Sequence, residues 1–308
     1  MNETPMDGKS APLKVSVVLP AYDEAEGIEG VIARIREVMD PAGWSYEILV
    51  ADDGSTDDTA QRARDAGARV VSHPYNMGNG AAVKTGIRNA AGEYTVLLDA
   101  DGQHPPEKIP ELLAALSTFH MAVGARTADS DTHAHRNLAN FAYNALASYV
   151  TGRRIPDLTS GFRAVRTRVA REFVSLLPNT FSYPSTLTLS LMRSGYAVTF
   201  LPITAAKRKG KSKIKLVRDG SRFFFIILKI ATLFAPMKVF LPASLSMFLA
   251  GVAYGLVKIF VLQEPYGPTS AMLMTVAVLI FMIGLVSEQV TQLRFDQASR
   301  DHPGRGDS

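Results

Sequence analysis

The sequence has no cysteine among its 308 residues, which excludes disulfide bonds, thiolate zinc sites and cysteine nucleophiles. An apolar run is also missing from its beginning: the first 12 residues are polar, whereas a secretory signal needs an apolar core. We therefore expect the N-terminal part to stay in the cytosol. Charge is scarce in one region, because only Lys229, Lys238, Lys258 and Glu264 are charged between residues 223 and 287.

Basic residues are concentrated immediately before this apolar region. The net charge is +4, and residues 207–222 contain eight Lys or Arg against one Asp. A basic segment beside an apolar span is typical of a chain that meets the anionic surface of a membrane. We therefore expect membrane lipids, and no nucleic acid, as partners.

Two apolar runs predict a membrane hairpin. Residues 239–257 and 268–287 contain 19 and 20 positions without a charge, and about 20 apolar residues cross the hydrocarbon core of a bilayer. The loop between them has no Lys or Arg, whereas Arg294 and Arg300 follow the second run. Because positive residues favour the cytoplasmic side, we predict helices at 239–262 and 268–290 in the cytoplasmic membrane, with both termini cytosolic. A buried hairpin of a soluble protein is the alternative.

The first 200 residues alternate between strand-like and helix-like segments. Short apolar runs predict strands at 13–19, 46–51, 68–72, 94–98, 120–125 and 197–201, and helical spacing predicts helices at 28–39, 56–66, 79–91, 137–151, 169–177 and 185–194. Ser55 or Thr56 is the expected cap of the second helix. This alternation favours an α/β fold, with a mostly parallel sheet covered by helices on both faces and ligands at the carboxyl ends of its strands.

Acidic residues follow three of the predicted strands. The first strand runs into Asp23 and Glu24, the second into Asp52 and Asp53, and the fourth into Asp99, Asp101 and Gln103. Asp99 and Asp101, one residue apart, are suited to share a hard cation such as Mg²⁺ or Mn²⁺ with a substrate diphosphate, and Gln103 offers a further oxygen. Solvated aspartates in a turn are the simpler alternative.

Other polar residues are weaker candidates for contacts with a nucleotide, a diphosphate or a metal ion. Asp52 and Asp53 are placed to bind a base or ribose, whereas Asp57 and Asp58 suit the N-terminus of a helix. The glycines of Asn76-Met77-Gly78-Asn79-Gly80 permit a close backbone approach before a helix, although this is not a Walker A loop. Arg126 and Arg136 are candidate diphosphate partners, with surface arginines as the equal alternative. The spacing of His104, His133 and His135 in a loop is more typical of coincidence than of a metal site.

Six motifs occur in an order that resembles family 2 glycosyltransferases of the GT-A fold, in particular polyprenyl-phosphate glycosyltransferases related to dolichyl-phosphate mannose synthase. They are PAYDE at 20–24, DDGSTDDT at 52–59, NMGNGAA at 76–82, LDADGQH at 98–104, DLTSGFR at 157–163 and GKSK at 210–213. The resemblance covers nearly the whole chain. One departure is Thr186 or a neighbour, where dolichyl-phosphate mannose synthases tend to have a glutamate.

The resemblance implies a Rossmann-like GT-A domain, followed by the transmembrane hairpin, and roles for particular residues. The nucleotide-sugar would contact Pro20, Tyr22, Glu24, Asp52, Asp53 and Asp99. The metal would be bound by Asp99, Asp101 and Gln103. Asp101, Arg126, Arg136 and Arg163 would be catalytic, and the acceptor phosphate would contact Ser160, Arg208, Ser212 and Lys213.

The expected reaction is the metal-dependent, inverting transfer of a hexose from a GDP-mannose or UDP-glucose type of donor to undecaprenyl or dolichyl phosphate. A hydroxyl acceptor, such as a glycolipid or polysaccharide, remains an alternative; it needs a base, for which Asp157 is the candidate. A catalytically inactive membrane adaptor is the non-enzyme alternative.

The expected organisation follows these segments in order. It comprises a flexible N-terminus (1–12), the glycosyltransferase domain (13–206), a basic juxtamembrane and interfacial segment (207–236), the hairpin (237–293) and a cytosolic tail (294–308). Two short spans leave room for a homo-oligomer formed by helix association.

Overall fold

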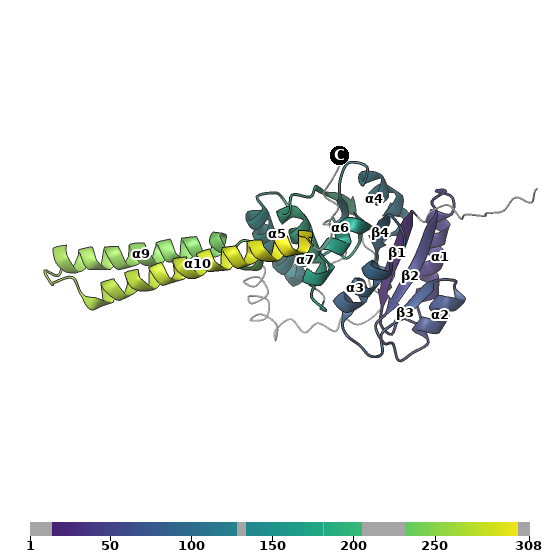
Figure 1. Cartoon of the computed structure of the whole chain (residues 1–308), viewed down its shortest axis with the longest axis horizontal. Helices are drawn as coiled ribbons and strands as arrows, with labels where there is room; N and C mark the ends of the chain where they lie inside the picture. Colours follow the sequence, from purple (N-terminus) through teal and green to yellow (C-terminus); the bar gives the residue numbers. More distant parts are fainter. Residues whose placement is uncertain (1–13, 128–133, 181, 205–231, 301–308) are drawn as a thin grey trace, which may run out of the picture. The chain divides into compact units, whose positions relative to one another are not determined.

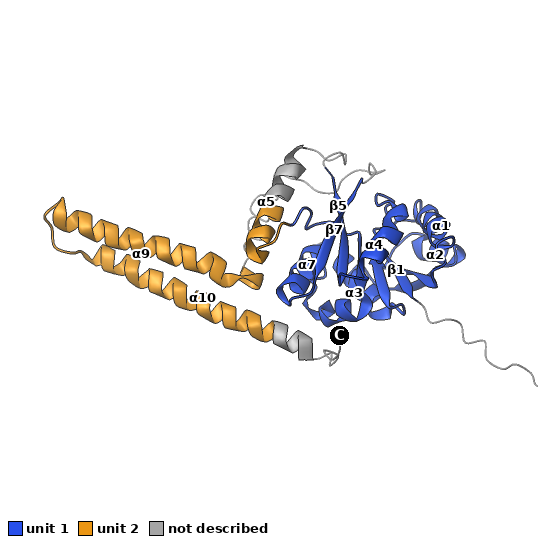
Figure 2. Cartoon of the chain, turned by 90° about the horizontal axis from the view of Figure 1, so that it is seen from above, with its two compact units in different colours: residues 1–141, 155–212 blue, residues 142–154, 213–308 orange. Residues whose placement is uncertain are grey.

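The computed structural model describes residues 14–127, 134–180, 182–204 and 232–300. Residues 134–142 and 295–300, which lie in helices, are described by their backbone alone. The elements of the structure are shown in Figure 1. The chain folds into two compact units, coloured separately in Figure 2. The first comprises residues 1–141 and 155–212, and the second comprises residues 142–154 and 213–308.

A seven-stranded sheet forms the centre of the first unit, with the order β3-β2-β1-β4-β6-β5-β7. All pairs are parallel except those of β6, which runs antiparallel to both neighbours. This confirms the mostly parallel sheet, while β6 was not predicted. The strands are β1 Val15–Ala21, β2 Tyr46–Asp52, β3 Arg69–Ser72, β4 Tyr94–Leu97, β5 Met121–Arg126, β6 Arg163–Arg166 and β7 Val198–Ile203.

Helices cover both faces of this sheet because successive side chains of a strand point to opposite faces. Val17 of β1 belongs to a buried cluster with Ile32 of α1 (Ile28–Met39). Val18 faces the other way, toward Gly86 of α3 (Asn79–Asn89), where an added Cβ would lie 2.2 Å from the valine side chain. The remaining helices of this unit's fold are α2 Thr59–Asp65, η1 Pro106–Lys108, α4 Ile109–Ala115, α6 Thr167–Glu172, η2 Val174–Leu176 and α7 Tyr183–Arg193.

One helix, α5 (Ala134–Thr151), runs from the first unit into the second. The second unit also contains α9 (Pro236–Phe260) and α10 (Pro268–Arg300). Both are long and apolar enough to cross a membrane, and only 17% of each apolar window is buried, unlike a core helix of a soluble protein. The predicted pair of spans is therefore confirmed as two apolar helices.

Small residues lie where α9 packs against α10 and its preceding loop. An added Cβ on Gly251 would lie 3.1 Å from Leu273, one on Gly255 would lie 2.2 Å from the Tyr266 ring, and one on Gly284 would lie 2.6 Å from Phe240. Such residues allow helices to approach closely where lipid offers no hydrophobic driving force. The two apolar helices therefore form a packed hairpin.

Candidate active site

The predicted meeting of acidic strand ends is confirmed by the register of the sheet. Ala21 at the end of β1 pairs with Asp52 at the end of β2, and Val18 pairs with Leu97 at the end of β4. Because these strands are parallel, their carboxyl ends lie at one edge of the sheet. The residues that follow them therefore share that edge.

The loop after β1 and the loop after β2 are joined by side chains of both, each of which binds the backbone of the other loop. Asp23, at φ 52°, accepts a 2.8 Å hydrogen bond from the Thr56 backbone N–H. Asp57 accepts one of 3.1 Å from the Ala25 N–H and one of 3.0 Å from the Thr59 N–H. The predicted helix cap is wrong, because α2 begins only at Thr59 after Asp58. The preceding residues are used instead to join the two loops.

The predicted nucleotide residues differ in exposure. Asp52 is buried and accepts the Ser55 N–H at 3.1 Å. Pro20 is buried within β1, Glu24 is intermediate, and Tyr22 is 37% exposed. The backbone N–H of Glu24 donates to Thr59 Oγ1 at 2.8 Å. Of these residues, Tyr22 offers the most surface to a ligand.

Asp53 is almost completely buried and organises the glycine loop at 76–80. Its carboxylate accepts the backbone N–H groups of Met77 at 2.9 Å and Gly78 at 2.8 Å. It also lies 2.8 Å from His73 Nδ1. Three partners from the protein itself indicate that Asp53 shapes the loop. Its contact with a base or ribose stays a prediction.

The glycine loop does allow a close backbone approach, but the approaching group is another loop of this chain. Gly78, at φ 106°, has no room for a Cβ, which would lie 2.3 Å from the Asn179 carbonyl oxygen. A Cβ on Gly80 would lie 2.1 Å from the Pro178 carbonyl oxygen. The Ala81 N–H donates to the Asn179 carbonyl at 3.3 Å. The glycines therefore seat the start of α3 against residues 178–180.

We expect Gly80→Ala to lower the free energy of unfolding by about 1–3 kcal/mol, because the new methyl group collides with backbone atoms that cannot rotate away. Gly30→Ala is the matched control, since Gly30 lies within α1 and an added Cβ meets nothing within 4 Å. There we expect up to about 1 kcal/mol of stabilisation from the better helix propensity of alanine. Thermal unfolding measures both; equal effects from the two variants contradict the close approach.

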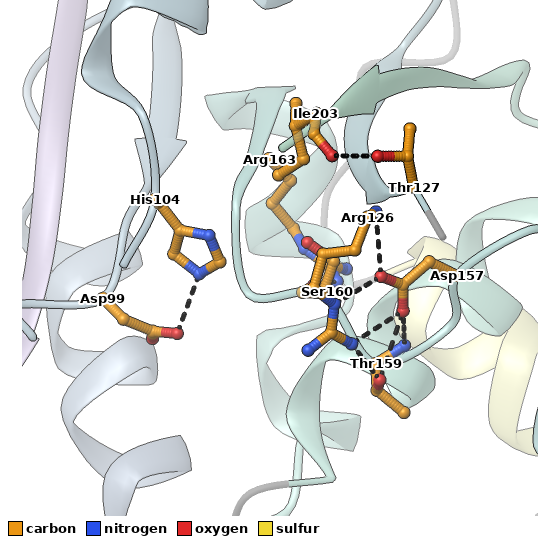
Figure 3. Close-up of polar contacts among 9 residues, drawn as sticks. All are labelled: Asp99, His104, Arg126, Thr127, Asp157, Thr159, Ser160, Arg163 and Ile203. Carbon is orange, nitrogen blue, oxygen red and sulfur yellow. Dashed lines mark hydrogen bonds and ion pairs between the residues drawn. The ribbon is translucent and has the colours of Figure 1, made fainter. Parts of the chain in front are cut away.

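Asp99 lies just beyond β4 and contacts His104, as Figure 3 shows. His104 Nε2 is 3.1 Å from the Asp99 carboxylate, and its ring stacks on Phe162 with centroids 5.4 Å apart. Burial alone would raise the pKa of Asp99, but the hydrogen bond from His104 and the charges of His104, Arg163 and Arg126 lower it below its ordinary value. Asp99 is therefore ionised at neutral pH.

The second predicted metal ligand, Asp101, accepts the Gln103 backbone N–H at 3.1 Å. Within the described residues, no three His, Asp or Glu side chains are grouped so that they could hold a metal ion. A cation at Asp99 and Asp101 would therefore need oxygen ligands from elsewhere, such as an amide or a bound phosphate. That is an ordinary arrangement for Mg²⁺, which is often bound by one or two carboxylates together with substrate phosphates.

Arg126, at the end of β5, forms a two-pronged ion pair with Asp157. Its Nε and Nη2 lie 2.7 and 3.0 Å from the two carboxylate oxygens, and Nη2 also donates to Thr159 Oγ1 at 2.6 Å. Burial by itself would raise the pKa of Asp157, but the hydrogen bonds and charge of Arg126 lower it. A carboxylate with a lowered pKa is a poor general base, which disfavours Asp157 in that role.

Arg163, in β6, is fully buried rather than placed on a surface. Its Nη1 donates to the Pro184 carbonyl at 2.9 Å and to Thr188 Oγ1 at 3.1 Å, and its Nη2 donates to the Ser160 carbonyl. The catalytic role that the resemblance implies for Arg163 stays a prediction. Arg163 holds the 157–163 segment against α7, where Thr186 is also buried.

Two features of this segment were not recognised in the sequence. Gly161 admits Asp99, since an added Cβ would lie 2.8 Å from its carboxylate. The hydroxyl of Ser160 is buried and has no hydrogen-bond partner within the described part of the chain. The Arg136 side chain, His133, the His135 side chain, Arg208, Ser212 and Lys213 lie outside the described residues.

Comparison with family models gives two matches. Residues 16–174 match the model described as glycosyl transferase family 2. Residues 235–293 match the model described as GtrB C-terminal hairpin. The first match covers the sheet edge with Asp99, Asp101 and Arg163, and the second covers the apolar hairpin.

Curated relatives align with most of the chain. The undecaprenyl-phosphate 4-deoxy-4-formamido-L-arabinose transferase of Klebsiella pneumoniae subsp. pneumoniae is 29% identical over 88% of this chain and 84% of its own length. The protein of the same name from Enterobacter sp. is 30% identical over the same shares.

Solved structures share the fold. Glucosyl-3-phosphoglycerate synthase from Mycobacterium tuberculosis, in complex with Mn²⁺, UDP and phosphoglyceric acid, is 24% identical, with a TM-score of 0.56 over 71% of this chain and 77% of that chain. Mannosyl-3-phosphoglycerate synthase from Rubrobacter xylanophilus is 20% identical, with a TM-score of 0.55 over 71% and 72%.

Proposed function

The chain belongs to glycosyl transferase family 2, and we propose that it transfers a hexose from a nucleotide-sugar to a polyprenyl monophosphate with inversion, giving a polyprenyl-phosphate sugar. The observation that carries the proposal is the combination, in one chain, of an acidic strand edge and a membrane-length hairpin. The name of the relatives, undecaprenyl-phosphate transferases, supports the acceptor class. GDP-mannose and UDP-glucose types are the proposed donors.

On the donor side, Asp99 and Asp101 would hold Mg²⁺ or Mn²⁺ with Gln103 and the diphosphate. The lowered pKa of Asp99 supports this set, because a ligand carboxylate must be ionised. The bound cation would neutralise charge on the leaving nucleoside diphosphate. Tyr22 and Glu24 would contact the nucleotide, and Arg126, ion-paired to Asp157, would add positive charge near Asp99.

On the acceptor side, a lipid monophosphate needs no general base. The second pKa of a phosphate monoester is about 6, so the nucleophile is already mostly dianionic at neutral pH. The pairing of Asp157 with Arg126 is consistent with such an acceptor and disfavours a hydroxyl acceptor activated by Asp157. Arg136, Arg208, Ser212 and Lys213 are proposed, from the sequence, to contact the acceptor phosphate from the cytosolic side.

The direct test offers labelled GDP- and UDP-sugars to membranes that contain the protein, together with undecaprenyl or dolichyl phosphate. We expect one donor to give a lipid-linked sugar, EDTA to abolish the product, and Mg²⁺ or Mn²⁺ to restore it. Product formed only on a glycolipid or polysaccharide would favour the hydroxyl acceptor. Metal-dependent binding of GDP or UDP, measured by thermal shift, separates an enzyme from an inactive adaptor; no binding and no product would contradict the proposal.

A further inference from the structure

The base of the apolar hairpin is attached to the end of α5, in the same compact unit (Figure 2). Lys238 Nζ donates to the backbone carbonyls of Tyr149 and Val150 at 2.7 and 2.8 Å. The ammonium also lies 5.4 Å from the centre of the Tyr149 ring. Because the last carbonyls of a helix lack partners and carry partial negative charge, Lys238 caps α5. The end of α5 therefore lies beside Lys238 of α9.

The spacing of charges along α9 defines an apolar band of bilayer thickness. Lys238 and Lys258 are 20 positions apart within this helix, or about 30 Å at 1.5 Å per residue, which is the thickness of the hydrocarbon core. At the far end, Lys258 forms a 2.7 Å ion pair with Glu264. Lys238 therefore marks the boundary of the apolar band at the end that contacts α5, and Lys258 marks the opposite boundary.

The neighbouring helix has its boundary at the same height. Gly284 of α10 faces Met237 and Phe240 of α9, and Glu288, one turn further, is the first charged residue of α10. Both helices thus change from apolar to charged beside Lys238. This agreement does not depend on α5.

The segment at the end of α5 has the composition of a membrane interface. Tyr149 is 54% exposed, and Arg153 and Arg154 follow it and are exposed. Neither guanidinium has a hydrogen bond or ion pair with any residue in the described ranges. Tyrosine concentrates at headgroup level, and arginine near the surface is attracted to anionic lipid.

We propose that residues 149–154, the α5 end, lie at the bilayer surface and that Arg153 and Arg154 bind the phosphate groups of anionic phospholipids. The α5 end then acts as a membrane contact in addition to the one that the sequence predicts for residues 207–222. The inference rests on the hairpin spanning a bilayer and not on sugar transfer.

Fluorescence quenching tests the depth of this segment in the full chain. Trp44 is the only tryptophan, so a Trp44→Phe/Tyr149→Trp variant in phospholipid vesicles reports from the α5 end alone. We expect a spin label near the lipid headgroup to quench this reporter at least about twofold more than a label near the chain terminus, as for an interfacial aromatic. A Trp44→Phe/Phe248→Trp control, within the apolar band, should show the opposite order.

Headgroup preference is tested with the same reporter. At equal mole fraction, headgroup-labelled phosphatidylglycerol should quench more than headgroup-labelled phosphatidylcholine. Adding Arg153→Gln/Arg154→Gln to the reporter variant should remove this preference. Each arginine that is removed should lower the local affinity for the anionic lipid about fivefold. Arg62→Gln/Arg64→Gln, two exposed arginines of α2, should leave it unchanged.

Three results would overturn the proposal: no quenching by either depth label, stronger quenching by the deep label, or equal quenching by the two headgroups while both arginines are present. Should the tryptophan variant not fold, Arg153→Cys carries a unique spin label in this cysteine-free chain, and its accessibility to water-soluble and lipid-soluble relaxants reads the same depth. Full exposure to the water-soluble agent would be equally contrary. If the full chain shows the expected quenching but transfers no sugar, the result would count against the proposed function alone.

Discussion

Asp101→Asn is expected to lower sugar transfer by about a thousandfold, the upper range for removing one electrostatic contact to a transition state. The substitution keeps the shape of the side chain and removes the charge that would share a cation with Asp99 and the diphosphate. Transfer should fall mainly through kcat, because charge on the leaving diphosphate grows as the sugar leaves.

The control for this prediction is Glu107→Gln. Glu107 is a nearby carboxylate that forms an exposed ion pair with Arg34 at 2.8 Å, and exposed pairs contribute about 0–1 kcal/mol. Transfer by Glu107→Gln should stay close to wild type. The Mn²⁺-dependent thermal shift with GDP or UDP should disappear in Asp101→Asn and persist in Glu107→Gln. Transfer within tenfold of wild type in Asp101→Asn would remove Asp101 from the proposed metal site.

Asp157→Asn is expected to destabilise the first unit by about 3–5 kcal/mol, because it leaves the guanidinium of Arg126 inside the protein without its counter-charge. The side chains of Arg126 and Asp157 are only 22% and 6% exposed. In a unit of this size that loss lowers Tm by about 10 °C. Arg126→Met/Asp157→Leu should recover part of the loss, since an apolar pair leaves no unpaired charge. Breaking the exposed pair with Arg34→Met is the control and should cost less than about 1 kcal/mol.

The pH dependence of this pair has a definite sign. The pKa of Asp157 is lowered in the folded protein, so the pair's contribution is fully present above the unfolded value of about 3.9 and is lost as pH falls through the folded pKa. Wild type should therefore lose stability more steeply than Asp157→Asn below about pH 4, and both should have parallel profiles between pH 5 and 7. Parallel acid limbs would show that Asp157 is not ionised by Arg126.

Much of the fold was predictable because its central strands, such as β1 and β4, are buried on both faces and helices such as α1 have one apolar face. The α1 prediction agrees with the structure at both ends, and β2 differs by one residue. The strand β6 was missed for a physical reason: it has four residues, with Arg163 and Arg166 at its two ends, and resembles a solvated loop. Burial of Arg163 depends on the Pro184 carbonyl and the Thr188 hydroxyl of α7, which no local pattern reveals.

The site was predictable as a set of residues but not as a set of partners. The sequence marks Asp53, Asp57 and Asp157 as polar residues of interest, yet each has partners that lie far away along the chain. Asp53 binds backbone N–H groups 24 and 25 positions away, and Asp157 binds a side chain 31 positions away. Backbone donors carry no residue signature, so a carboxylate that organises a loop looks the same in sequence as one that binds a ligand.

The placement of β6 also has a consequence for how the chain is made. This strand joins β4 to β5, so the sheet would remain as two pieces, β3-β2-β1-β4 and β5-β7, if β6 were absent. During synthesis from the N-terminus, the edges of β4 and β5 that face β6 stay unpaired until residues 163–166 have been made. Unpaired strand edges are prone to wrong pairing and aggregation. The strand that closes the sheet also brings Gly161 to Asp99 and Arg163 beneath the site. A chain in which β6 has not yet paired therefore exposes open strand edges and lacks a complete candidate site.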